Sequence, residues 1–130
     1  KRDKAQGVPG PEEVYRPEFQ AVPPARGGGP PSVPALKSRQ GDAANNFTPD
    51  PSIPANNFVV LEDPKSLFAA QNVVPLLTKA KVNPAIQDAL NAVSAKLDTK
   101  TLTGLLAQVV TEKKDADQVA GEFLKANGLG

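Results

Sequence analysis

The chain has 130 residues with 15 basic and 14 acidic side chains, so its net charge is close to zero. This length allows one modest domain or part of a larger one, and the even charge excludes a strong electrostatic footprint for nucleic acid or an anionic membrane. The chain has no His, Cys, Met or Trp, which excludes histidine-based triads, thiol nucleophiles, disulfides and the usual zinc sites.

Lys1 stands where a complete reading frame would begin with Met, so we expect a mature or truncated chain. The sequence has no apolar run of about 18 residues and no signal peptide at this N-terminus. A processed protein loses its leader, and both exported and cytosolic proteins can lack Cys, so these features leave the compartment open.

Prolines divide the sequence, because eleven of the 14 lie in residues 1–54. This part is predicted to be partly irregular, and taken alone it has a composition typical of disorder. Residues 32–42 are nevertheless predicted to form a short helix, with Ser32 as its N-cap and Gly41 as its stop. Four residues ahead of that helix are candidates for packing: Val14, Tyr15, Phe19 and Val22.

Two segments are predicted to be strands. Residues 57–63 (NFVVLED) are short, apolar and β-branched, with Asn-Asn at their start and Asp-Pro at their end. Residues 72–77 (NVVPLL) are the second candidate, and Pro75 limits them to an edge strand or a bulge.

From residue 83 onward the periodicity predicts three amphipathic helices. Asn83 is the expected N-cap of the first, with Pro84 at its first helical position. Either Asp98 or Thr99 is expected to cap the second. The buried stripes of these two helices are predicted to be Ile86, Leu90, Val93 and Leu97, and Leu102, Leu105, Leu106 and Val109.

The third helix is predicted to begin at Asp115, which has capping-box spacing to Gln118. Gly128 is expected to end it in the left-handed conformation, with Leu129 folding back onto the helix. Its predicted buried stripe is Val119, Ala120, Phe123 and Leu124. Three helices with an apolar face need a surface to cover, and two strands are too few to provide all of it.

Motifs for catalysis are scarce. The RGGGPPS stretch at residues 26–32 lacks the GxxxxGK[ST] spacing of a phosphate loop, so a turn before a helix is the simpler interpretation. The carboxylates show no spacing typical of acid/base partners, and we expect them to act as caps or solvated charges, with Asp50 capping the DPSI turn. The sequence therefore predicts no catalytic residue, no metal site and no cofactor.

Two polar clusters lie in segments without helical periodicity, FTPD at 47–50 and AAQNVVP at 69–75. Their polar side chains are candidates to hydrogen-bond a ligand, and nearby aromatic rings are candidates to offer a face to it; loop capping and core packing are the alternative. The candidate residues are Phe47, Thr48, Phe68, Gln71 and Asn72.

Three stretches match a known family: GDAANNFTPDPSIPANNFVVLEDPKSLFAAQNVVPLL, ALNAVSAKLDTKTLTGLLAQV and VAGEFLKANGL. They closely resemble the C-terminal half of substrate-binding proteins of osmoprotectant ABC transporters, the glycine betaine, carnitine and choline group. The resemblance implies an α/β fold, the C-terminal half of a two-lobe type II periplasmic-binding-protein fold that is helix-rich from residue 83. Residues 1–62 would form the latter part of the second lobe, and residues 63–130 the hinge return and the C-terminal part of the first lobe.

The resemblance also implies a function without catalysis: binding a quaternary-ammonium solute such as glycine betaine for ABC permease subunits in the membrane, with no nucleic-acid partner. A quaternary ammonium has no N–H to donate, so aromatic faces hold it by cation–π attraction. In the family, a cage Tyr is frequent where Phe47 stands, followed by Ser or Thr where Thr48 stands. High-affinity Gram-positive members have Tyr-Tyr where Gln71 and Asn72 stand, and the amide pair leaves a different or more polar solute open.

The chain departs from the family chiefly at prolines. Pro49 replaces the usual Thr inside the binding loop, where it either stiffens or distorts that loop. Other departures are Arg26, Pro31, Ser32, Pro34 and Pro54. With the first lobe incomplete, we expect this chain alone to bind solute weakly or not at all. The family location is extracytoplasmic if the full-length protein carries a signal peptide.

Two other functions remain open. A small helical interaction module with a Pro-rich arm predicts that residues 83–129 fold alone while residues 1–56 stay disordered. An effector-sensing domain of a transcription regulator shares the two-lobe architecture and would need a DNA-binding segment upstream.

Overall fold

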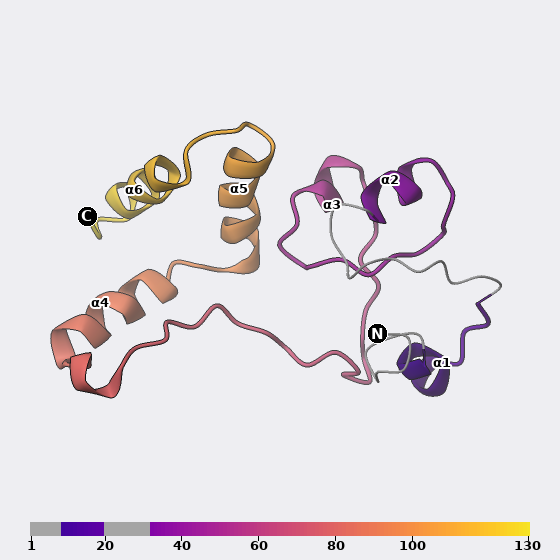
Figure 1. Ribbon diagram of the computed structural model, residues 1–130, viewed down its shortest axis with the longest axis horizontal. Helices are drawn as coiled ribbons and strands as arrows, with labels where there is room; N and C mark the ends of the chain where they lie inside the picture. Colours follow the sequence, from indigo (N-terminus) through magenta and orange to yellow (C-terminus); the bar gives the residue numbers. More distant parts are fainter. Residues whose placement is uncertain (1–8, 20–31) are drawn as a thin grey trace. The chain divides into compact units, whose positions relative to one another are not determined.

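The computed structural model describes residues 9–19 and 32–130 (Figure 1). Within these residues the regular structure is helical, and no strand is present. The chain divides into two compact units, one of residues 1–46 and 56–72 and the other of residues 47–55 and 73–130. The helices in chain order are α1 (Pro9–Tyr15), α2 (Ser32–Lys37), α3 (Ser52–Ala55), the 3₁₀ helix η1 (Lys79–Lys81), α4 (Pro84–Ser94), α5 (Thr99–Val110) and α6 (Ala116–Ala126).

The first unit contains α1, α2 and the irregular segment 56–72. Helix α2 is shorter than the predicted helix over 32–42, because the chain leaves the helix at Arg39 rather than at Gly41. Arg39 has a φ of 56°, and the next amide, that of Gln40, donates to the Ala35 carbonyl at 2.9 Å. This is the hydrogen-bonding pattern of an α-helix that ends at a residue in the left-handed conformation. Arg39 takes that conformation in place of Gly41, the predicted stop. Ser32 is the first helical residue rather than the N-cap before it.

The two predicted strands, residues 57–63 and 72–77, are not strands in the structure. A strand exists only when a neighbouring strand exchanges backbone hydrogen bonds with it, and the described residues provide no such neighbour. Large apolar side chains in both segments are exposed, among them Leu61 at 78% and Leu76 at 97%. The α/β class is therefore not confirmed in residues 9–19 and 32–130, which are helical and irregular.

The second unit contains α3 to α6, and the three predicted helices after residue 83 are confirmed. Asn83 caps α4 by accepting a hydrogen bond from the Ile86 amide at 3.0 Å, and Pro84 is the first helical residue. Asp98, rather than Thr99, caps α5, with its carboxylate 2.6 Å from the Thr101 amide. These bonds satisfy amides that have no intrahelical partner.

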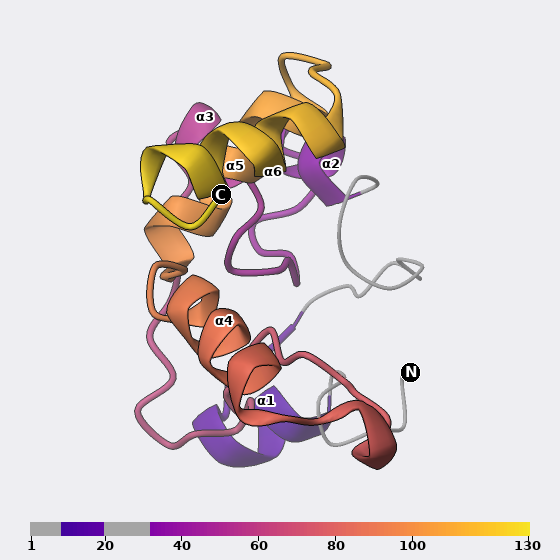
Figure 2. The ribbon, with the colours of Figure 1, turned by 90° about the vertical axis from the view of Figure 1, so that its left-hand side faces the viewer.

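Helices α5 and α6 pack against each other, and α6 crosses α5 in the view of Figure 2. Val119 of α6, 3% exposed, is the one buried residue with a large apolar side chain that the described part contains. The remaining predicted stripe residues of α6 are half-buried or, at Ala120, exposed. The packing that holds this unit is therefore thin, and capping contributes much of the local order.

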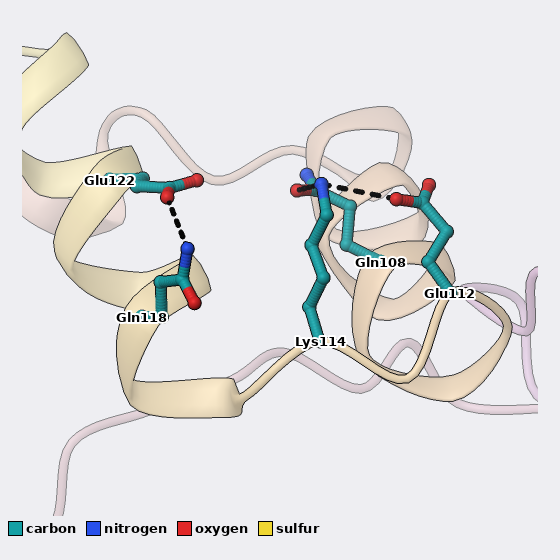
Figure 3. Close-up of polar contacts among 5 residues, drawn as sticks. All are labelled: Gln108, Glu112, Lys114, Gln118 and Glu122. Atoms are coloured by element: carbon teal, nitrogen blue, oxygen red, sulfur yellow. Dashed lines mark hydrogen bonds and ion pairs between the residues drawn. The ribbon is translucent and has the colours of Figure 1, made fainter.

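Both ends of α6 form as the sequence predicts, except for one hydrogen bond of the capping box. Asp115 accepts from the amides of Asp117 and Gln118, at 3.1 and 3.0 Å. The Gln118 side chain does not complete the capping box, because it donates to Glu122 at 2.8 Å instead (Figure 3). At the other end Gly128 has a φ of 68°, and the Leu129 amide donates to the Leu124 carbonyl at 2.9 Å, as predicted.

Candidate functional site

Phe47 and Thr48, the first two candidate residues, lie in a tight turn of the second unit. The turn is closed by the Asp50 amide, which donates to the Phe47 carbonyl at 3.0 Å. Asp50 then starts α3: its carboxylate accepts from the Ser52 amide at 2.8 Å and its carbonyl from the Ile53 amide at 3.1 Å. The predicted capping role of Asp50 is confirmed.

Phe47 is 61% exposed, and Thr48 is also exposed. An exposed ring next to a hydroxyl is chemically suited to a cation that has methyl groups and polar substituents. Pro49 occupies a position in this turn where no backbone N–H is used, since the closing hydrogen bond comes from Asp50. Pro49 therefore removes no hydrogen bond from the turn.

Gln71 and Asn72, the candidates with amide side chains, lie in the first unit. Both are exposed, in a segment with neither helix nor strand. Their amide side chains can each donate and accept hydrogen bonds. Phe68, three residues ahead of Gln71, is 42% exposed.

A polar cluster missed by the sequence analysis stands directly before this segment. Tyr15, at the end of α1, donates its hydroxyl hydrogen bond to an Asp63 carboxylate oxygen. The same carboxylate accepts from the amides of Leu67 at 3.0 Å and Phe68 at 2.7 Å. The Lys65 amide donates to the Tyr15 hydroxyl oxygen at 2.9 Å. Asp63 therefore organises the turn that leads toward Gln71.

The protonation chemistry of this cluster follows from these bonds. The hydrogen bonds from Tyr15 and from the Phe68 and Leu67 amides lower the pKa of Asp63 below its ordinary value, because they favour the carboxylate. Desolvation of the phenol, together with its hydrogen bond and proximity to the Asp63 charge, raises the pKa of Tyr15. At neutral pH the pair is a neutral phenol donating to a carboxylate.

Part of this cluster had a sequence signal and part had none. Asp followed by Pro favours the start of a turn, and Asp63-Pro64 fits that pattern. Tyr15 was expected to pack, and its role as donor depends on a contact across 48 residues of sequence.

Several predicted features lie outside the described residues: Val22, Arg26 and the glycines and prolines of residues 27–31. Within the residues that the structure does describe, no group of three or more acidic, His or Cys side chains is placed to hold a metal ion. No helix of the described part has the length and apolar character needed to cross a membrane.

Comparison with known proteins gives the family. Residues 32–126 match OpuAC, the substrate binding domain of the ABC-type glycine betaine transport system. The chain belongs to the OpuAC family. The matched range includes Phe47, Thr48, Gln71 and Asn72. OpuAC proteins serve transport and are not a class of enzymes, and membership implies the periplasmic-binding-protein fold.

Two bacterial relatives agree with this OpuAC assignment. The chain is 30% identical over 95 residues to the carnitine transport binding protein OpuCC of Listeria monocytogenes, covering 72% of this chain and 31% of the relative. It is 29% identical over 97 residues to the glycine-betaine-binding protein of Pseudomonas aeruginosa, covering 73% of this chain and 31% of that protein. The chain thus spans about a third of the length of these relatives. No solved structure matches it significantly.

Proposed function

We propose that this chain is part of a solute-binding protein that takes up a compatible solute for an osmoprotectant ABC transporter. The observation that supports this proposal is the family match over residues 32–126, which includes every candidate binding residue. The two relatives are named for carnitine and glycine betaine, and both compounds are quaternary ammonium carboxylates. A ligand of that class, delivered to ABC permease subunits outside the cytoplasm, is the function that we propose.

Each unit contains two of the proposed binding residues. The exposed ring of Phe47 is suited to the methylated cation by cation–π attraction, with Thr48 beside it. Gln71 and Asn72 would hydrogen-bond polar groups of the solute. The assignment of residues 1–62 to the second lobe and 63–130 to the first belongs to the same proposal, as does a first lobe that is incomplete in this chain.

A small helical interaction module is the alternative, and it accounts for less. Such a module would need only the capped helices from residue 84 onward. The family match begins at residue 32 and includes the Pro-rich segment with Phe47 and Thr48, which the module would leave without a role.

A nuclear magnetic resonance titration of the isotopically labelled chain tests the proposal. Glycine betaine is added and the amide signals of Thr48, Asp50, Gln71 and Asn72 are followed. We expect specific shifts with an affinity weaker than micromolar, because the chain spans about a third of its relatives' length. Glycine is the matched control solute, since it keeps the carboxylate and lacks the three N-methyl groups.

Two variants separate binding from general effects. Phe47→Ala is expected to weaken the response, and Phe19→Ala, which removes another exposed ring, is expected to leave it unchanged. If glycine shifts these amides as strongly as glycine betaine does, the proposed function is wrong.

A further inference from the structure

Tyr15, Asp63 and Lys65, named here the tyrosine latch, form a long-range polar cluster within the first unit. Its members come from the end of α1 and from the turn after residue 62. We infer that Tyr15 is a positioning residue, which holds the Asp63 turn and thereby sets the course of the chain that carries Phe68, Gln71 and Asn72. The latch itself depends only on contacts within the first unit. The importance of the latch for solute binding rests on the proposed function.

The latch joins its parts by several bonds at once. The Tyr15 hydroxyl is both donor and acceptor, donating to Asp63 and accepting from the Lys65 amide at 2.9 Å. The Lys65 ammonium donates to the Val14 carbonyl at 2.6 Å and lies 5.4 Å from the centre of the Tyr15 ring, within cation–π range. Two elements far apart in sequence are thus tied through one side chain.

Asp63 passes this constraint to the following chain. Its two carboxylate oxygens accept the amides of Leu67 and Phe68, and its carbonyl accepts the Ser66 amide at 3.0 Å. Ser66 takes the left-handed conformation with a φ of 52°, which these bonds help to hold. A carboxylate that accepts several hydrogen bonds is held in one orientation. The hydrogen bond from the Tyr15 hydroxyl therefore favours one orientation of the Asp63 carboxylate.

The segment that follows Phe68 has little other structure to fix its backbone course. Residues 69–78 have neither helix nor strand, and Gln71 and Asn72 are exposed. The course of an irregular segment depends strongly on how its ends are fixed. The latch fixes the end nearest to Phe68, which is why a residue in α1 can influence two candidate binding residues more than fifty positions away.

The sequence provides an internal probe, since Tyr15 is the chain's single tyrosine and there is no tryptophan. All tyrosine fluorescence and phenol absorbance therefore report on the latch. A phenol that donates to a carboxylate is quenched, so Asp63→Asn is expected to raise the fluorescence. Glu62→Gln changes the neighbouring carboxylate in the same way and is the matched control, with no change expected.

The deciding experiment compares Tyr15→Phe with the unchanged chain. The variant keeps the ring over Lys65 and removes only the hydroxyl. We expect the amides of Leu67 and Phe68 to exchange about fivefold faster, the factor of one ordinary hydrogen bond, and the signals of Gln71 and Asn72 to move. The Ile86 amide at the α4 cap serves as the reference and should not change.

The outcomes separate the latch from the proposed function. Unchanged exchange at Leu67 and Phe68 in Tyr15→Phe, or fluorescence that responds equally to Asp63→Asn and Glu62→Gln, overturns the latch. If the unchanged chain binds glycine betaine, Tyr15→Phe should weaken that binding several-fold, and equal affinity also overturns the inference. A chain in which glycine shifts the amides as strongly as glycine betaine does, but which shows the exchange and fluorescence effects, supports the latch and counts against the proposed function alone.

Discussion

Val119 in α6 provides a quantitative test of how the helical unit is held, because its side chain is 3% exposed. Val119→Ala removes two buried methyl groups, which at about 0.8 kcal/mol each lowers stability by about 1.6 kcal/mol. The higher helix propensity of Ala offsets about 0.5 kcal/mol of that loss. We expect the free energy of opening α6 to fall by about 1 kcal/mol, and by more if the packing does not close around the cavity.

Val110 is the matched control, since it lies at the end of α5 and is 52% exposed. Roughly half of the burial term applies to it, about 0.8 kcal/mol, and the propensity gain nearly cancels that loss. Val110→Ala should therefore change the opening free energy by about 0.5 kcal/mol or less. The two variants differ in burial while making the same chemical change.

Native-state amide exchange is the suitable assay, because it gives an opening free energy for each amide without assuming that the whole chain unfolds in one step. The amides of each mutated helix, α6 for Val119→Ala and α5 for Val110→Ala, are compared with the same amides of the unchanged chain. Equal effects of Val119→Ala and Val110→Ala would refute the reasoning, since burial could then not be the cause.

Three further changes address caps and turns. Asn83→Ala removes the capping acceptor of α4 and should lower the opening free energy of its first turn by about 1 kcal/mol, whereas Asn91→Ala within the helix should not. Hydrogen bonds from the Thr101 amide and hydroxyl lower the pKa of Asp98 in the folded chain. The ionised Asp98 therefore stabilises α5 above the unfolded pKa, and this stabilisation is lost as the pH falls through the folded pKa. Circular dichroism during acid titration should show α5 losing helix, and Asp98→Asn should lack this pH dependence. Gly128→Ala places a side chain at a φ of 68° and should destabilise the end of α6 by about 1 kcal/mol, while Gly121→Ala, inside the helix with open space around it, should stabilise it, both read from amide exchange.

The caps could be predicted from sequence because each depends on neighbours within a few positions. Asn83, Asp98 and Asp115 accept from amides two or three residues ahead, and a short pattern contains all of that information. The end of α2 was predicted at the wrong residue for a related reason. Glycine is preferred in the left-handed conformation but is not required, and Arg39 takes it here.

The candidate site was only partly accessible to sequence reasoning. The capping role of Asp50 was local and therefore predictable. Tyr15 was not, because its partner lies 48 residues away and nothing in the spacing marks the pair. A contact of that length becomes visible only when the chain's course is known.

The difference between the helices and the expected strands has the same physical origin. A helix satisfies its backbone within its own segment, so α4 to α6 form in the described residues wherever the pattern predicts them. The apolar pattern of residues 57–63 states which side chains favour burial but contains no hydrogen-bonding partner for the backbone. Val59 remains 84% exposed and Leu61 78%, and covering each such side chain would contribute roughly 1.5 to 3 kcal/mol. The sequence thus encodes a preference for burial that the described residues leave unmet, and a strand prediction is a statement about a neighbour as much as about the segment itself.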